Sequence, residues 1–183
     1  MSSTNHVELR NVTKQFGSQK AVNQVDLVLK AGESVGMAGH NGAGKSTIMK
    51  LILGLITPTK GEVMLLGEPT GSKAGAQRRS QIGYLPETVA LHPSLTGIET
   101  MDFYAKLKKQ PLSKNRELLE RVGISQAARR RVGTYSKGMR QRLALAQALL
   151  GEPKVLLFDE PTTGLDPASR QMFYEVVREL NGR

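Results

Sequence analysis

The first thirty residues alternate between apolar and polar positions in the manner of two half-buried strands. The apolar positions are Val7, Leu9, Val12, Val25, Leu27 and Leu29. Since successive side chains of a strand point to opposite faces, this alternation predicts a sheet with one face in the core. Gly17-Ser18 supplies a turn between the two segments, so we expect a small antiparallel β layer at the start of the chain.

Four later segments have the apolar runs that are typical of core strands. They are residues 34–38, 62–66, 82–86 and 155–158. We expect the first of them to be a buried strand. The last is apolar at every position, which is typical of a parallel strand covered on both faces.

Apolar residues recur at helical spacing in the segments between and after these strands. They predict a helix from residue 45 through Leu55, one from residue 97, one around 115–122, one over 137–150 and one from residue 167. Thr96 and Glu99 are spaced as a capping box, and Ser136 and Asp166 are N-cap types. Residues 71–79 are polar and contain glycine, so we expect a surface loop there. The pattern therefore predicts an α/β core, with a helical insert because residues 88–134 show only helices and polar loops.

One glycine-rich segment fits the phosphate-binding pattern G-x-x-x-x-G-K-[ST], namely Gly39-His40-Asn41-Gly42-Ala43-Gly44-Lys45-Ser46-Thr47. Its position between a predicted strand and a predicted helix argues against a chance glycine-rich turn. The glycines let successive N–H groups face phosphate oxygens at a helix start that carries partial positive charge. Lys45 can reach the β- and γ-phosphates, the Ser46 hydroxyl can ligate Mg²⁺, and His40 is interpreted as a spacer. We therefore predict a nucleotide site.

Two carboxylates, Asp159 and Glu160, directly follow the last predicted strand. By themselves they could be solvated, but open α/β sheets bind ligands at the carboxyl ends of their strands. In a chain with a phosphate loop, Asp159 could hold Mg²⁺ through water and Glu160 could polarise the water that attacks a γ-phosphate.

Composition excludes some classes of protein but leaves the binding partner open. The chain has 183 residues, a hydrophobic content of 39%, no cysteine and a formal net charge of +10. One domain with a real core is expected, and a disulfide framework or a thiolate metal site is excluded. The charge admits nucleic acid, anionic lipid, an acidic partner or only a solvated basic face. No leader pattern or membrane-spanning run is present, so a cytoplasmic location is expected.

Three segments, taken in order, resemble the motifs of ATP-binding-cassette (ABC) ATPases. They are the phosphate loop, Tyr135-Ser136-Lys137-Gly138-Met139-Arg140-Gln141-Arg142, and Leu156 to Thr162 followed by Gly164-Leu165-Asp166. The resemblance implies a P-loop NTPase (RecA-like) core with an N-terminal antiparallel β layer and a helical insert. It also implies ATP and Mg²⁺ as cofactors, hydrolysis of ATP, head-to-tail homodimerisation and a separate membrane permease as partner. Such a subunit would lie on the inner face of the cell membrane.

The resemblance also implies roles for individual residues. Phe16 would stack on adenine, although a buried core position is the simple alternative. Lys45, Ser46 and Thr47 would serve phosphate and Mg²⁺, Asp159 would be the Walker B aspartate, and Glu160 would be the catalytic glutamate. The signature motif, Ser136 to Met139, would contact the nucleotide of the partner copy, and Asp166 would lie at the dimer interface.

This sequence departs from the family pattern at three of these positions. Lys137 and Met139 replace a glycine and a glutamine of the usual signature, and Glu87 stands where the family has a glutamine that senses Mg²⁺. A carboxylate can still ligate Mg²⁺, but it adds charge. The variants resemble the branch that serves exporter-type permeases. More narrowly, residues 39–42 and 135–147 resemble the ATPase of the copper-processing system that matures nitrous oxide reductase.

We expect one ABC ATPase domain, with residues 1–87 and 152–183 as the nucleotide-binding core and 88–151 as a helical subdomain. No histidine follows His92, and the family's switch histidine lies on a strand beyond the last predicted helix. By resemblance we therefore expect the C-terminal part of the fold to be absent, with low stability and negligible turnover that an extended chain would regain. Two alternatives stay open: a soluble ABC-type ATPase acting on nucleic acid or ribosomes, although nucleic acid is not the expected partner, and a nucleotide-binding fragment without turnover.

Overall fold

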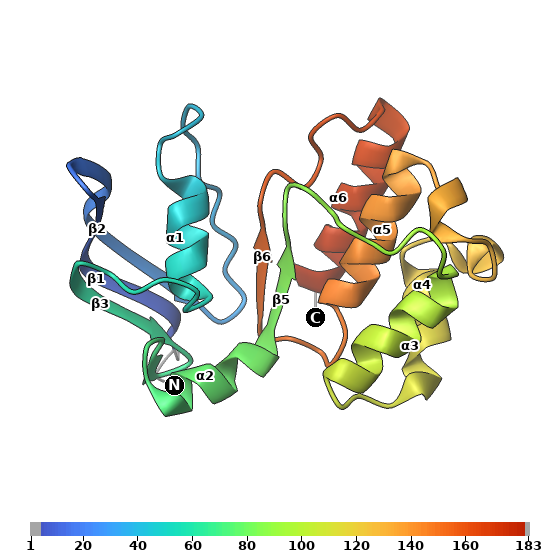
Figure 1. Cartoon of the computed structure of the whole chain (residues 1–183), viewed down its shortest axis with the longest axis horizontal. Coiled ribbons are helices and arrows are strands. Elements are labelled where there is room, and N and C mark those ends of the chain that lie inside the picture. The colour runs from blue at the N-terminus through green and yellow to red at the C-terminus, as the bar shows by residue number, and fades with distance from the viewer. Residues whose placement is uncertain (1–4, 182–183) are drawn as a thin grey trace. The chain divides into compact units, whose positions relative to one another are not determined.

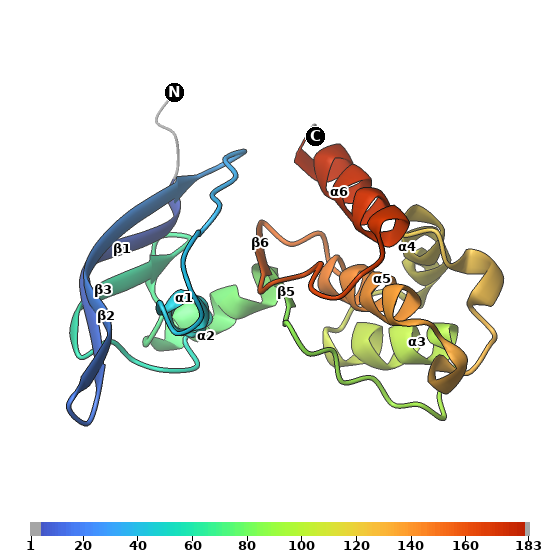
Figure 2. The ribbon, with the colours of Figure 1, turned by 90° about the horizontal axis from the view of Figure 1, so that it is seen from above.

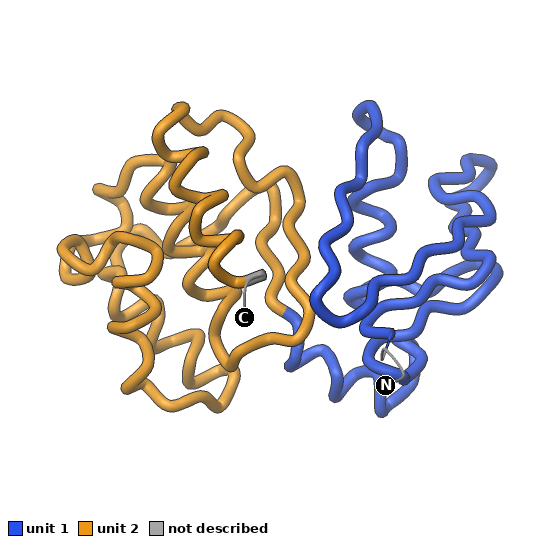
Figure 3. Tube along the Cα trace, turned by 180° about the vertical axis from the view of Figure 1, so that it is seen from behind, with its two compact units in different colours: residues 1–82 blue, residues 83–183 orange. Residues whose placement is uncertain are grey.

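The computed structural model describes residues 5–181. The chain forms two compact units that divide after Ile82, and each is described by itself (Figure 3). No helix within the described range is long and apolar enough to cross a membrane. Whether residues 152–183 group with the phosphate loop, as predicted, concerns the arrangement of the two units and stays a prediction.

Unit 1 is built on the predicted antiparallel layer. Strands β1 (Asn5–Phe16) and β2 (Gln19–Lys30) pair antiparallel around the turn at residues 17–18, as expected (Figure 1). β3 (Lys60–Leu65) and β4 (Glu68–Pro69) complete the order β2-β1-β3-β4. The alternating apolar side chains of β1 and β3 are buried, including Val7, Leu9, Val63 and Leu65. One face of the sheet therefore forms the core of this unit.

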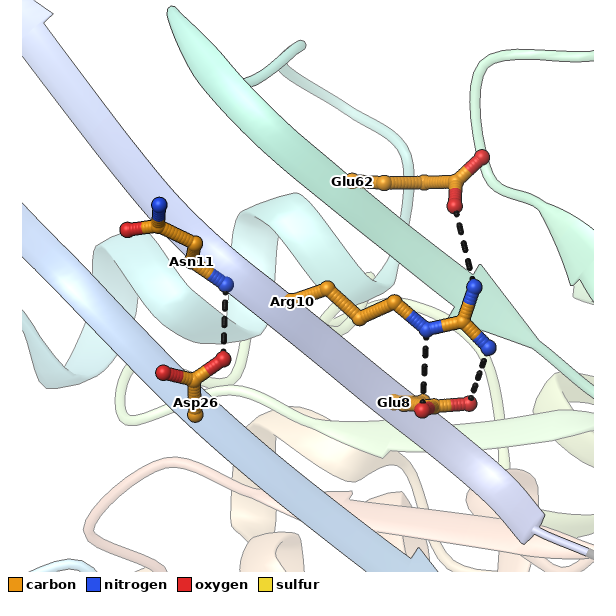
Figure 4. A network of polar contacts seen from close by, with 5 residues as sticks. All are labelled: Glu8, Arg10, Asn11, Asp26 and Glu62. Carbon is orange, nitrogen blue, oxygen red and sulfur yellow. Dashed lines mark hydrogen bonds and ion pairs between the residues drawn. The ribbon is translucent and has the colours of Figure 1, made fainter.

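The other face of β1 carries polar side chains that bond to one another (Figure 4). Arg10 donates from Nε and Nη2 to the Glu8 carboxylate at 2.9 and 3.0 Å, and from Nη1 to Glu62 at 3.5 Å. The hydrogen bond from Arg10 lowers the pKa of Glu8. Asn11 has a φ of 46° at a shift in the strand register, and its N–H donates to Asp26 Oδ1 at 2.7 Å. The Asp26 carboxylate thus accepts the N–H group at the bulge in β1.

The helix that follows the phosphate loop, α1 (Lys45–Ile52), packs against this sheet through Met49, Leu51 and Ile52 (Figure 1). It is shorter than predicted. Gly54 has a φ of 62° and its N–H donates to the Leu51 carbonyl at 3.0 Å, which ends the helix. Leu55, expected on the buried helical face, is therefore outside the helix and 64% exposed.

Two further predictions for unit 1 are wrong. Residues 34–38 form no strand and are largely exposed, with Val35 at 51%. An apolar run becomes a strand only where a neighbouring strand offers a continuous set of backbone partners, and neither sheet of the described residues includes this segment. Residues 71–79 contain a helix, α2 (Lys73–Arg78), because Ser72 accepts the Gly75 N–H at 2.9 Å as an N-cap.

Unit 2 consists of a strand pair and a group of helices (Figure 2). A short 3₁₀ turn at the end of unit 1 (Arg79–Gln81) leads into β5 (Ile82–Leu85), which pairs with β6 (Val155–Phe158). The Asp159 N–H donates to the Leu85 carbonyl at 2.9 Å, so the carboxyl ends of the two strands lie together. This agrees with the prediction of a parallel strand. The predicted cover on both faces of β6 is wrong, because Leu156 and Phe158 are only partly buried. The helices are α3 (Gly97–Leu107), α4 (Asn115–Arg121), α5 (Lys137–Ala148) and α6 (Pro167–Asn181), with 3₁₀ turns at Leu112–Lys114, Ser125–Ala127 and Val132–Thr134.

The core of unit 2 gathers around α5. Its fully buried residues include Met101 of α3, Leu119 of α4, Leu143 and Leu145 of α5 and Phe173 of α6. The helical insert predicted for residues 88–134 is confirmed, because between β5 and α5 the structure has only helices, 3₁₀ turns, loops and one isolated bridge.

The predicted helix starts are confirmed by their caps. Thr96 Oγ1 accepts the Glu99 N–H at 3.3 Å while the Glu99 carboxylate accepts the Thr96 N–H at 2.8 Å, which completes the capping box of α3. Ser136 Oγ accepts the Met139 N–H at 3.2 Å at the start of α5. Asp166 Oδ1 accepts the Ser169 N–H at 2.9 Å in the first turn of α6.

Candidate functional site

The phosphate loop of unit 1 is shaped by backbone conformations that favour glycine. Gly42 and Gly44 have φ angles of 86° and 91°, which side chains with a Cβ rarely adopt. A Cβ at Gly44 would also overlap the carbonyl oxygen of Ala21 on β2. The Ala43 N–H donates to the His40 carbonyl at 3.1 Å and closes the turn. Two glycines of the pattern are thus explained by backbone shape, and Gly44 also by close packing on the sheet.

The Lys45 side chain folds back over this loop. Its Nζ donates to the carbonyl oxygens of Gly39 at 2.7 Å and His40 at 3.1 Å. The His40 ring Nδ1 lies 2.8 Å from the Asn41 carbonyl oxygen, so this side chain is engaged with the loop itself. The ammonium group is therefore held against the backbone to which the sequence pattern assigns the phosphates.

Helix α1 starts at the end of the loop without a side-chain cap. Gly44 is its N-cap residue, and the Ile48 N–H makes a bond of 2.9 Å to the Gly44 carbonyl. The earlier N–H groups of Ser46 and Thr47 lie outside the α-helical ladder, where the helix dipole contributes partial positive charge. N–H groups, an ammonium group and a hydroxyl together fit the phosphates of a nucleotide, and the Ser46 oxygen is a hard donor of the kind that Mg²⁺ prefers.

Phe16 ends β1 next to the hairpin turn and is 51% exposed. The alternative of a buried core residue is therefore wrong. The Nζ of Lys14 lies over the ring, 5.0 Å from its centroid. An exposed ring in the same unit as the phosphate loop is available for stacking.

Asp159 and Glu160 lie at the carboxyl end of β6 in unit 2. Asp159 is buried, with 6% of its surface exposed. Burial and then the charge of Asp159 raise the pKa of Tyr84 on the neighbouring strand, so the two side chains share one environment. Glu160 has a φ of 45°, and its carboxylate accepts the Thr163 hydroxyl at 3.1 Å. A left-handed backbone at a non-glycine residue is uncommon and clusters at functional sites.

The signature segment packs against the residues that precede and begin α6. A Cβ at Gly138 would lie 2.6 Å from Ser169 Oγ. The Lys137 Nζ fills the space where a Cβ at Gly164 would be, and Gly164 has a φ of 68°. Hydrogen bonds from Ser169 lower the pKa of Asp166. The predicted signature and interface residues thus form one contiguous cluster within unit 2.

The remaining predicted ligands are less tightly grouped. Glu87 is exposed, two residues beyond the end of β5. Ser46 belongs to unit 1, whereas Asp159 and Glu87 belong to unit 2, so their common Mg²⁺ site stays a prediction. Across residues 5–181, no group of three or more His, Cys, Asp or Glu side chains could hold a metal ion by itself.

Sequence reasoning missed three residues that lie near the predicted site residues. Lys14 precedes Phe16 by two residues, and that spacing on a strand could have indicated a shared face. Ser169 follows the Asp166 cap by three residues, which is the spacing of a capped N–H. Tyr84 gave no signal, because its proximity to Asp159 depends on the pairing of β5 with β6.

Comparison with known proteins identifies the family. Residues 22–163 match the profile of the family described as ABC transporter. The chain belongs to this ABC transporter family. The linearmycin resistance ATP-binding protein of Bacillus subtilis is 36% identical over 179 residues, which cover 96% of this chain and 57% of that protein. The Nod factor export ATP-binding protein I of Burkholderia lata is 39% identical over 181 residues, which cover 97% and 59%. The ABC chain described here thus spans less than two thirds of the length of these relatives.

Two solved ABC structures share the fold. A bacterial ABC transporter cassette solved as a dimer matches with a TM-score of 0.85 and 29% identity, over 96% of this chain and 83% of that one. An ATP binding subunit of an ABC transporter matches with a TM-score of 0.82 and 30% identity, over 96% and 75%. The predicted fold class is confirmed: an ABC ATPase cassette, which is a P-loop NTPase with an antiparallel β layer and helices.

Proposed function

We propose that this chain is the ATP-binding and ATP-hydrolysing part of an ABC transporter and that it energises a separate membrane permease. The observation that carries the proposal is the phosphate loop, where the Lys45 ammonium lies on the carbonyls of Gly39 and His40 beside the uncapped start of α1. Membership of the ABC transporter family supports the transport role. So do the names of two relatives, one an export and one a resistance ATP-binding protein.

The proposal assigns phosphate binding, Mg²⁺ binding and activation of the attacking water to different residues. Lys45 and the loop N–H groups bind the phosphates, and Ser46, Asp159 and Glu87 hold Mg²⁺, which supplies charge neutralisation. Glu160 orients and polarises the attacking water. The Thr163 hydroxyl, which donates to Glu160 at 3.1 Å, supports the role of Glu160 because it fixes the carboxylate.

The proposal includes a head-to-tail homodimer. Ser136, Lys137, Gly138 and Met139 contact the nucleotide of the partner copy, and Asp166 lies at the interface. A relative of the same fold that was solved as a dimer supports this step.

The proposal also includes a location and a cargo. We place this chain on the cytoplasmic face of the membrane, next to a permease that supplies the passage for the cargo. Maturation of the copper enzyme nitrous oxide reductase is a narrower proposal, supported only by residues 39–42 and 135–147. The relatives are named for Nod factor export and linearmycin resistance instead.

The experiment is ATP binding and phosphate release by the parent chain and by Lys45→Ala. We expect affinity for ATP to fall about 10- to 150-fold, because a charge-assisted contact contributes about 1.5–3 kcal/mol and about 1.4 kcal/mol is tenfold. Lys50→Ala is the matched control, since Lys50 is an exposed lysine in the last turn of the same helix.

The outcomes separate the proposed roles. Unchanged ATP affinity in Lys45→Ala would overturn the phosphate-loop assignment. ATP binding without phosphate release by a version of the chain extended to the length of these relatives would leave a nucleotide-binding protein and remove the hydrolytic part of the proposal. Affinity for duplex DNA or ribosomes at physiological salt would favour a soluble ABC-type ATPase over a transport subunit.

A further inference from the structure

Lys14 and Phe16 form a contact at the tip of the β1–β2 hairpin that the proposed function does not use. We propose that Lys14 is a positioning residue, whose ammonium group occupies one face of the Phe16 ring so that the other face receives the base of the nucleotide. The inference rests on the proposed nucleotide site. It adds a residue to that site and explains how an exposed ring keeps one orientation.

The distances support an attractive contact. The Nζ of Lys14 lies 5.0 Å from the ring centroid, within the roughly 6 Å over which a cation is attracted to an aromatic face. The same Nζ donates to the Thr57 carbonyl at 2.8 Å. A lysine that only extended into solvent would have neither partner. The ammonium group is thus held between a carbonyl oxygen and the ring.

Further hydrogen bonds fix the hairpin tip on which the ring lies. The Gln15 N–H donates to Thr59 Oγ1 at 3.0 Å, and its side-chain Nε2 donates to the Gly17 carbonyl at 2.7 Å. The Thr59 N–H donates to the Thr13 carbonyl at 2.8 Å. The strand end on both sides of Lys14 is therefore tied to the turn between α1 and β3, and the ring is attached to an ordered backbone.

This hairpin also supports the phosphate loop. Ala21 of β2 lies directly under Gly44, where a Cβ would overlap its carbonyl oxygen. Thr57, the acceptor for Lys14, follows the helix that begins at the loop. Ring and phosphate loop therefore belong to one packed unit. Fixing the ring fixes a base platform relative to the phosphates.

The electrostatics favour a base on the open face. Aromatic faces carry negative charge, so two stacked rings repel face to face. A cation on the far face of Phe16 offsets part of this charge. The ring is 51% exposed, which leaves surface for one stacking partner.

The test compares ATP with inorganic tripolyphosphate, which has the phosphates but no base, by calorimetry on the full chain. We expect Lys14→Met to weaken ATP binding about two- to fivefold and to leave tripolyphosphate unchanged, because the mutant loses only the cation over the ring. Lys14→Arg keeps the charge and should restore ATP affinity. Lys20→Met, an exposed lysine on β2, is the control for loss of one positive charge.

A spectroscopic signature tests the contact directly. The chain has no tryptophan, so Phe16→Trp places a single tryptophan, as a fluorescent reporter, at the ring position. In that background, we expect Lys14→Met to change the emission of the free protein and Lys20→Met to leave it unchanged.

Each result decides a separate question. If Lys14→Met weakened the binding of ATP and of tripolyphosphate equally, Lys14 would be a phosphate contact and the inference would be overturned. Unchanged ATP affinity together with unchanged emission would also overturn it. If the parent binds tripolyphosphate and ATP equally, the base platform does not exist, although the phosphate site stands. If the parent binds neither, the proposed function fails and the inference falls with it.

Discussion

Gly44 is constrained twice, by its φ of 91° and by the Ala21 carbonyl oxygen that a Cβ would overlap. Gly42 has a similar φ of 86°, but a Cβ there would meet nothing within 4 Å. Comparing Gly42 with Gly44 therefore separates two ways in which a Cβ would destabilise the loop. One is backbone strain, and the other is steric overlap with the strand under the loop.

We predict that Gly44→Ala is the more damaging of the two substitutions. Left-handed backbone at alanine costs about 1–2 kcal/mol, which is the whole cost expected for Gly42→Ala. Overlap in a packed region adds about 1–3 kcal/mol, so Gly44→Ala should lower the free energy of unfolding by about 2–5 kcal/mol. Urea unfolding of both variants measures the difference. Equal losses would show that the packing of the loop on β2 is looser than the structure has it.

At the scale of one element, α3 begins with a complete capping box. Hydrogen bonds from the Thr96 N–H and hydroxyl lower the pKa of Glu99 from its ordinary 4.5. Because the folded-state pKa is depressed, the charged carboxylate stabilises the fold above the unfolded-state value. That contribution disappears as the pH falls through the lower, folded-state pKa.

We therefore predict that Glu99→Gln lowers the free energy of unfolding near neutral pH and that its difference from the parent shrinks below the ordinary pKa of 4.5. Denaturant unfolding at several pH values from about 3 to 7 measures this. Glu120→Gln is the control, since Glu120 lies in the C-terminal half of α4, away from any N-cap. A difference between Glu99→Gln and the parent that stays constant down to the lowest pH would contradict the prediction.

At the scale of the whole molecule, the structure gathers the signature segment and the start of α6 into one cluster of unit 2. Gly138 lies against Ser169, and Lys137 lies against Gly164. Ser136 has a local role as well, because its hydroxyl caps α5 at 3.2 Å. In the proposed dimer the same hydroxyl would contact the nucleotide of the partner copy.

The two roles of Ser136, as a helix cap and as a proposed dimer contact, can be separated by comparison with Thr96, which is only a cap. Ser136→Ala and Thr96→Ala each remove an N-cap, so each should lose about 0.5–2 kcal/mol of stability. Only Ser136→Ala should also weaken an ATP-dependent dimer, as measured by sedimentation with excess ATP. If both variants weakened the dimer to the same degree, Ser136 would act through helix stability alone.

Several structural features of this protein depend only on residues that are close together in the sequence. The phosphate loop, the hairpin, the capping box of Thr96 and Glu99 and the α5 cap at Ser136 all depend on residues close in sequence, and the structure has each where the pattern predicts it. Turn and cap chemistry is settled by hydrogen bonds within a few residues, so sequence spacing is sufficient.

Other features were decided by partners far along the chain. Residues 34–38 have the composition of a strand, but neither sheet of the described residues includes them, and they are largely exposed. The tertiary structure also brought Lys137 to Gly164, Tyr84 to Asp159, and Thr57 to the Lys14 that covers Phe16. Sequence by itself determined the shape of the predicted nucleotide-binding loop and the helix caps, since local bonds fix both. Tertiary structure decided which side chains surround them, because packing joins segments whose separation along the chain carries no periodic signal.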